Sequence, residues 1–278
     1  MTTTISEPAE PGSHAAPGHA ADLGHGTTAQ AGGQAGPGRV RARIAKRWWR
    51  RPWVAPLIVV AVIFVAFSVP PYLTGDPGRS RVPTHPDLAW YYPLLVAHIV
   101  FGSIALLTGC FQLWPWFRQR YPVAHRWMGR AYFFAGVFPA GVAVLAIAPL
   151  SSTGLVSQFG NTMLALLWLP ISIAGYRMAR QRRFTEHRRW MIRSFALTSS
   201  IVANRIWGAV MLIVFSPASL QSSAPGGMLA ADDFRGMAAV GLSTWLSWIV
   251  NLLIAEWWLE RTDFTQRNRA RRRARTAD

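Results

Sequence analysis

The chain has 278 residues, of which 51% are hydrophobic, and 29 Lys and Arg against 12 Asp and Glu give it a formal net charge of +17. A soluble protein this basic would be a candidate for binding nucleic acid. Here the apolar residues are instead gathered into long runs almost free of charge. We therefore predict an all-α integral membrane protein, with the lipid bilayer and not nucleic acid as its partner.

In chain order, the first element is a tail over residues 1–50, rich in Gly, Ala and Pro and without apolar periodicity, which we predict to be disordered. Residues 51–259 form a predicted membrane domain of six apolar runs, each read as one span of about 20 residues. A second basic tail follows over 260–278. The predicted spans cover residues 53–70, 90–114, 127–149, 159–176, 190–215 and 237–258.

The basic residues are concentrated on one side of these spans. Seven lie between Arg39 and Arg51, before the first span, and most others lie in the loops after the second and fourth spans and in the C-terminal tail. The positive-inside rule therefore places both termini in the cytoplasm. Lys46 is the single Lys among the basic residues, which is typical of GC-rich bacterial genes, so we predict a bacterial plasma membrane protein.

A short sequence motif occurs twice, as RQRYPVAHRWMGR over 118–130 and as RQRRFTEHRRWMIR over 180–193. Each copy ends a cytoplasmic loop and begins the next span. Spans two and three thus form one helical hairpin, and spans four and five form another with the same direction. This predicts a core four-helix bundle built from a tandem parallel repeat, with a pseudo-two-fold axis along the membrane normal. Spans one and six would flank this core.

The chain contains His98-x3-Gly102 leading into ALLTGCFQLWP (105–115), followed by HRWMGR and EHRRWMIRSFALT. These segments resemble the bacterial predicted membrane proteins known as domain of unknown function 2306. The resemblance covers roughly residues 55–258. It implies a multi-pass protein of the cell envelope, and it implies no reaction and no catalytic residues.

The arginines of the two copies are the first candidate site. Within each copy two arginines are four residues apart, so they share one helix face, and we expect the helices to start beside them, at Trp127 and Trp190. Free N–H groups at a helix start favour an anion such as a phosphate or a lipid headgroup. The alternative is that these arginines are interfacial anchors. The predicted cytoplasmic anion site consists of His125, Arg126, Arg130, His187, Arg189 and Arg193.

We therefore predict a non-catalytic binding or transport bundle for a small anionic or lipid-like ligand. The alternative is an oxidoreductase linked to a b-type haem or a quinone, with one haem held by His125 and His187. His98 has no His at its repeat position, which falls near Gly160 or Asn161. The lone Cys110 excludes a multi-cysteine metal cluster, and we expect no metal site. A homo-oligomer is compatible with these spans.

Two charged residues in or beside the spans complete the candidates. Glu256 lies near the cytoplasmic end of the last span, where it could pair with Arg130 or Arg193, or act as a proton relay. Arg205 lies well inside the fifth span, which is costly unless it has a partner or extends to the interface. We expect an outward-opening pocket for an anionic or quinone-like ligand, lined by His98, Asn161, Asn204 and Arg205.

Overall fold

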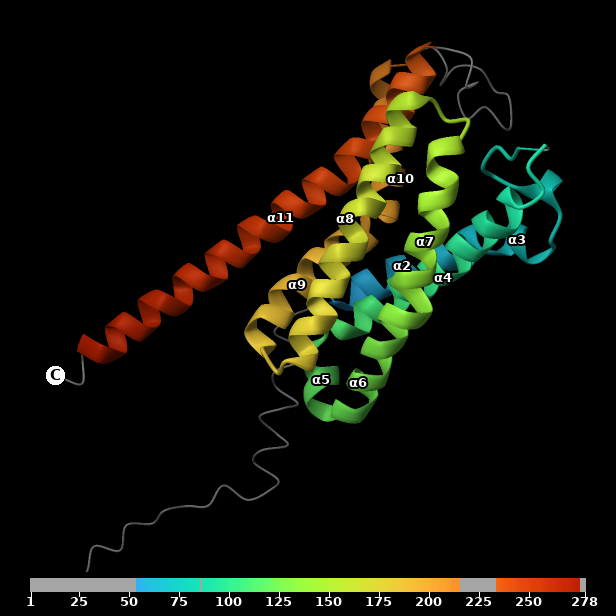
Figure 1. Cartoon of the computed structure of the whole chain (residues 1–278). Coiled ribbons are helices and arrows are strands. Elements are labelled where there is room, and N and C mark those ends of the chain that lie inside the picture. Colours follow the sequence, from blue (N-terminus) through green and yellow to red (C-terminus); the bar gives the residue numbers. More distant parts are fainter. Residues whose placement is uncertain (1–53, 86, 216–233, 276–278) are drawn as a thin grey trace, which may run out of the picture. The chain divides into compact units, whose positions relative to one another are not determined.

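The computed structural model describes residues 54–85, 87–215 and 234–275, with side chains described from Gly236 to Thr265 in the last segment. The predicted tail over 1–50 lies outside these residues. All regular elements of the described chain are helices (Figure 1). The α-helices are α2 Val54–Ser68, α3 Pro70–Leu73, α4 Tyr91–Gln112, α5 Pro115–Arg120, α6 Pro122–Arg130, α7 Phe138–Ile147, α8 Leu155–Arg180, α9 Phe184–Thr198, α10 Ser200–Phe215 and α11 Phe234–Arg275.

Four helical segments are long and apolar enough to cross a membrane, and α9 with α10 makes a fifth if this bent pair is one span. These five correspond to predicted spans two to six. The predicted first span is represented by α2, whose 15 residues are fewer than the roughly 20 that a bilayer requires. The count of six therefore stays a prediction. The four segments are Tyr91–Gln112, Pro122–Leu150, Leu155–Arg180 and Gly236–Thr265.

The helices that carry the two motif copies begin earlier than expected. Helix α6 starts at Pro122 and α9 at Phe184, so Trp127 and Trp190 lie inside their helices. Proline is well suited to the first helical turn, because its fixed φ is helical and its missing N–H would have no partner there. The motif arginines consequently lie one turn or more from the free N–H groups, which removes the helix-start argument for an anion site.

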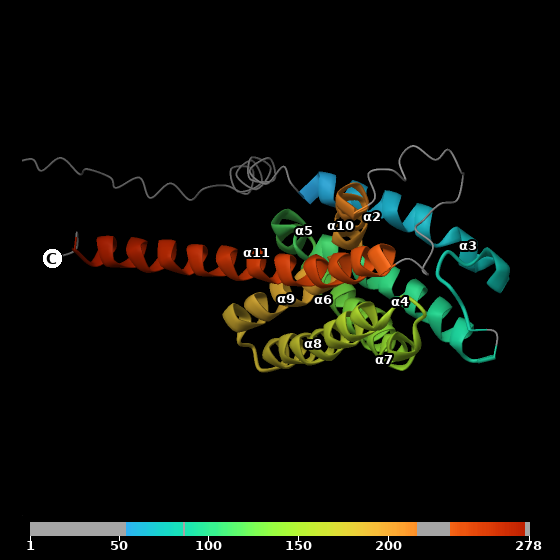
Figure 2. The same ribbon diagram turned by 90° about the horizontal axis from the view of Figure 1, so that it is seen from above.

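Helix α6 continues into α7 through a π-helix, η2, at Ala131–Val137. This segment and α7 pack along α4, while α11 packs against α8, α9 and α10. Figure 2 shows α11 between α10 on one side and α8 and α9 on the other. Glycines allow the closest approach: a Cβ on Gly136 would lie 2.9 Å from the Cα of Ala105 in α4. Such small residues let helix backbones meet in a membrane.

A network of buried polar side chains joins three of these helices. The Tyr132 hydroxyl lies 2.6 Å from Ser194 Oγ and 2.8 Å from Thr198 Oγ1. Trp168 Nε1 donates to Thr198 Oγ1 at 3.0 Å, and Ser172 Oγ lies 2.7 Å from Ser194 Oγ. Because all five side chains are buried, these bonds satisfy groups that would be costly to leave unpaired. The network fixes η2, α8 and α9 to one another.

Helices α9 and α10 meet at a bend of 42° beside Ser199. A bend frees backbone carbonyls from the regular helical pattern, and these must find donors inside a membrane. Asn251 of α11 supplies them: its Nδ2 donates to the Ala196 carbonyl at 3.1 Å and lies 3.3 Å from Ser199 Oγ. The bend is therefore a stabilised feature of the fold.

Candidate anion-binding site

Both copies of the motif lie at one end of the helix bundle. In Figure 1, α5 and α6 lie at the end where α8 passes into α9. We call this the arginine-rich end and define it by residues 113–130, 180–193 and 256–263. Here the chain turns twice, once from α4 to α6 and once from α8 to α9.

Each turn is closed by a hydrogen bond. In the first, Gln112 Nε2 donates to the His125 carbonyl at 2.9 Å. In the second, His187 Nδ1 lies 2.8 Å from the Gly175 carbonyl. Both bonds tie the preceding helix to the histidine of the motif, through the backbone of His125 in one turn and through the side chain of His187 in the other.

In the second copy, carboxylates from α11 neutralise Arg189 and Arg193. Arg193 Nε and Nη2 donate to the two oxygens of Glu256 at 2.5 and 2.8 Å, a two-pronged pair. Arg189 Nη2 lies 3.1 Å from Asp263 Oδ2. The partner of Glu256 is thus Arg193, one of the two considered from the sequence. Asp263 lies beyond the predicted sixth span and was missed, although its spacing of seven residues from Glu256 places both on one helix face.

In the first copy, the arginines are exposed and lack carboxylate partners. Among the described residues, no Asp or Glu pairs with any arginine between 118 and 130. Aromatic rings lie beside them instead: the Arg130 guanidinium lies 4.8 Å from the centre of the Trp127 ring, and that of Arg120 lies 5.6 Å from the Tyr121 ring. The unpaired arginines are Arg118, Arg120, Arg126 and Arg130.

A surface groove of about 470 Å³ runs along the turn between α5 and α6. Its wall carries large apolar side chains with high exposure, 46% for Tyr121 and 64% for Trp127. A guanidinium beside exposed aromatic rings is the combination typical of a membrane interface. We call this groove, together with Arg126 and Arg130, the α5–α6 groove. It is lined by Arg120, Tyr121, Pro122, Val123, Ala124 and Trp127.

The two histidines of the motif are in different states. Because a carbonyl can only accept, His187 carries a proton on Nδ1 and donates it to the Gly175 carbonyl. In the neutral ring this leaves Nε2 with a free lone pair. His125 Nδ1 is buried and has no partner. The two rings are close enough to interact electrostatically. Within the described residues, no group of three His, Cys, Asp or Glu side chains is arranged to hold a metal ion.

The residues expected to line an outward-opening pocket form separate local contacts. His98 Nδ1 lies 3.0 Å from the Ala140 carbonyl on α7, and Asn161 Nδ2 lies 3.4 Å from Ser157 Oγ on its own helix. Asn204 is half-buried and Arg205 is exposed. No hydrogen bond in the described chain joins two of these four residues. The pocket therefore stays a prediction.

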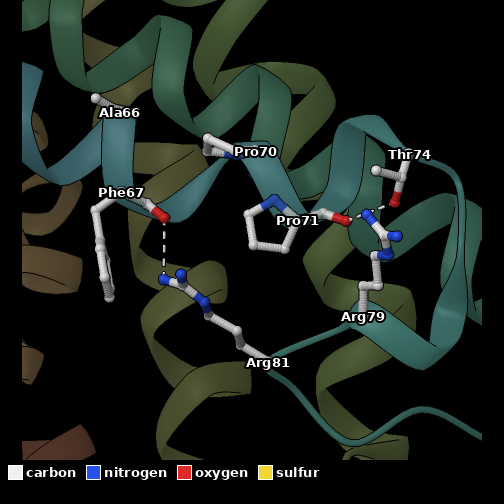
Figure 3. A pocket seen from close by; sticks show the side chains of 7 residues that line it. All are labelled: Ala66, Phe67, Pro70, Pro71, Thr74, Arg79 and Arg81. Carbon is white, nitrogen blue, oxygen red and sulfur yellow. Dashed lines mark hydrogen bonds between the residues drawn. The ribbon is translucent and has the colours of Figure 1, made fainter.

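A second groove, of about 620 Å³, lies at the C-terminal end of α2 (Figure 3). The helix ends here with a carbonyl left unpaired, because Pro71 has no N–H to bond the Phe67 carbonyl one turn earlier. Arg81 takes its place, with Nη1 donating to that carbonyl at 2.9 Å and the guanidinium 3.8 Å from the Phe67 ring. The sequence reading did not identify this groove, although the Pro70–Pro71 pair signals an unpaired helix end. Both of its arginines have partners, since Arg79 Nε lies 3.7 Å from Asp76 Oδ2 and Arg81 bonds the Phe67 carbonyl.

Comparison with known proteins gives one match. A family model described as predicted membrane protein (DUF2306) matches residues 95–259, which is more than half of the chain and includes both motif copies. No curated protein and no solved structure matches.

Proposed function

The chain belongs to the DUF2306 family of predicted membrane proteins, and on that premise we propose that it is a non-catalytic bundle that binds an anionic lipid headgroup in the α5–α6 groove. The observation that carries this proposal is a difference in charge between the two motif copies. In the second copy, Arg189 and Arg193 have carboxylate partners within the chain, whereas the corresponding Arg126 and Arg130 of the first copy are exposed and have none. An external anion supplies the missing countercharge.

A lipid fits this groove better than a free phosphate. Tyr121, Val123 and Trp127 together expose a substantial apolar surface, with Val123 at 56% exposure. Such side chains gain from contact with acyl chains, while arginines at the same depth attract the headgroup. A soluble anion would use the arginines and leave this apolar wall in water.

The proposal also includes the orientation expected from the sequence. We propose six spans, both termini in the cytoplasm of a bacterial plasma membrane, and two hairpins related by a parallel repeat. The location of both motif copies at one end of the bundle (Figure 1) supports the repeat. The excess of arginine at this end supports a cytoplasmic location, where anionic headgroups also attract basic residues.

The test is lipid retention by the purified full-length chain. Native mass spectrometry after exchange into mixed micelles containing phosphatidylglycerol or phosphatidylcholine should show preferential retention of phosphatidylglycerol. In the Arg126→Gln/Arg130→Gln variant, the loss of two interfacial charges, worth about 1 kcal/mol each, should weaken retention about 30-fold. The control is Arg79→Gln at the opposite end of the bundle. Equal retention by the double variant and the control would refute the site.

A second candidate is an oxidoreductase in which His125 and His187 hold a b-type haem. The observation in its favour is the proximity of two imidazoles, one with a free lone pair and the other with a buried unpartnered nitrogen. A reduced-minus-oxidised absorption spectrum of the purified protein separates the candidates. A Soret difference that disappears in both His125→Ala and His187→Ala would establish the haem, whereas a flat spectrum from haem-supplemented cells would exclude it.

A further inference from the structure

The arginine pairs of the two motif copies occupy the same positions in their hairpins but have different surroundings. Arg126 and Arg189 correspond, as do Arg130 and Arg193, because each stands at the same spacing from the Trp of its motif copy. Only the second pair lies against α11. Contact with α11 therefore distinguishes the internal ion-pair site of the second copy from the surface anion site proposed for the first.

The contact with Glu256 reproduces the geometry with which arginine binds phosphate. Two parallel N–H···O bonds from one guanidinium, here at 2.5 and 2.8 Å, are characteristic of both carboxylate and phosphate recognition. The Arg193 side chain is 21% exposed, and its guanidinium also lies 5.1 Å from the Trp190 ring. The first copy has the same cation–ring arrangement in Arg130 and Trp127, without the carboxylate.

The other pair in the second copy is incomplete. Asp263 contacts Nη2 of Arg189 at 3.1 Å, whereas Nε of the same guanidinium is buried and has no acceptor. A buried donor without a partner is destabilising. The Asp263 carboxylate therefore satisfies Arg189 only in part, whereas Glu256 bonds two nitrogens of Arg193. A phosphate that approaches Arg189 with two oxygens would accept from Nε as well.

We propose that the second motif copy is a latent anion site, in which Glu256 and Asp263 of α11 take the place of a phosphate. This inference rests on the proposed function, because it transfers the ligand class of the α5–α6 groove to the corresponding arginines. The ligand is a phosphate-bearing lipid headgroup, which binds Arg189 and Arg193 when the carboxylates are withdrawn. Helix α11 thereby acts as an internal competitor that limits anion binding to the first copy.

The experiment removes the two internal charges while conserving side-chain shape, with Glu256→Gln/Asp263→Asn in the full-length chain. Native mass spectrometry with phosphatidylglycerol micelles should show one more retained lipid than in the unsubstituted protein. Adding Arg189→Gln/Arg193→Gln should weaken retention of this extra lipid about 30-fold. A parallel titration with inorganic phosphate distinguishes the sources: competition only at far higher concentration indicates a lipid headgroup, and equal competition indicates a free-phosphate site.

The outcomes separate the two proposals. If the unsubstituted chain retains phosphatidylglycerol through Arg126 and Arg130 but the Glu256→Gln/Asp263→Asn variant gains none, the latent site is wrong and the proposed function stands. If the first copy retains none while the variant gains a lipid, the reverse holds. Should the double variant fail to insert, Asp263→Asn is measured alone, because its pair is partly exposed and its loss frees both nitrogens of Arg189. Glu256 still holds Arg193 in this variant, so the extra lipid should be retained more weakly. No gain of lipid at any phosphatidylglycerol concentration overturns the latent site.

Discussion

Replacement of Gly136 by alanine tests the packing that brings the π-helix against α4. An added Cβ would lie 2.9 Å from both Cα and Cβ of Ala105, and 3.0 Å from its backbone nitrogen. Relaxed carbon contacts are about 3.5–4.0 Å, so the helices must separate by roughly 0.6–1 Å. Because the contacted atoms of Ala105 are backbone atoms and the Cβ, no side-chain rotation can relieve the clash. Overpacking of this kind costs about 1–3 kcal/mol.

The matched control is Gly102→Ala on α4, where an added Cβ meets no atom within 4 Å. Alanine is favoured over glycine in a helix by about 0.5–1 kcal/mol, so this variant should be neutral or slightly more stable. The two variants should therefore differ by about 1.5–4 kcal/mol in the free energy of unfolding. The measurement is a titration with SDS in mixed micelles, followed by tryptophan fluorescence. Unfolding of both variants at the same SDS fraction would refute the packing argument.

Three further predictions follow from the same features. In the same SDS titration, Tyr132→Phe should lower the free energy of unfolding by about 0.6–1.7 kcal/mol, because Ser194 and Thr198 each lose a hydrogen bond. The control is Tyr92→Phe, which should cost nothing because the Tyr92 hydroxyl has no partner. Asn251→Leu should cost about 0.6 kcal/mol by the same measure, since it removes one of two donors to the Ala196 carbonyl and leaves the Ser199 hydroxyl, and an unchanged value would show that the bend is stable without Asn251. Reporter fusions after residue 258 should register as cytoplasmic and insertions within 216–236 as external, and the opposite pattern would exclude the proposed orientation.

The helices could be predicted from the sequence because a membrane span requires a long apolar run, and the runs are visible without any tertiary information. The residues at which the helices begin and end could not be predicted in this way. Pro122 and Phe184 begin helices in polar sequence, where amphipathic turns extend past the apolar core into the interface. The bend beside Ser199 was also missed, because the chain has no proline there and the stabilising donor, Asn251, is 52 residues away.

The sequence predicted that the two motif copies lie on one side of the membrane domain, and both lie at one end of the bundle (Figure 1). The anion site itself stays a prediction. The difference between the copies could not be predicted from spacing, because it depends on which copy α11 contacts. Buried hydroxyl groups such as Tyr132 and Ser194 gave no pattern in the sequence, because each is a single polar residue whose partner lies on another helix.

The two motif copies differ because α11 carries carboxylates to only one of the two corresponding arginine pairs. Within the described residues, Glu256 and Asp263 of α11 pair with Arg193 and Arg189, and Arg126 and Arg130 have no such partner. A charge held near a low-dielectric interior must be paired, so the contact with α11 is structural. Arg126 and Arg130 are exposed, where pairing is not required for stability. The first copy is therefore the one for which we propose a ligand.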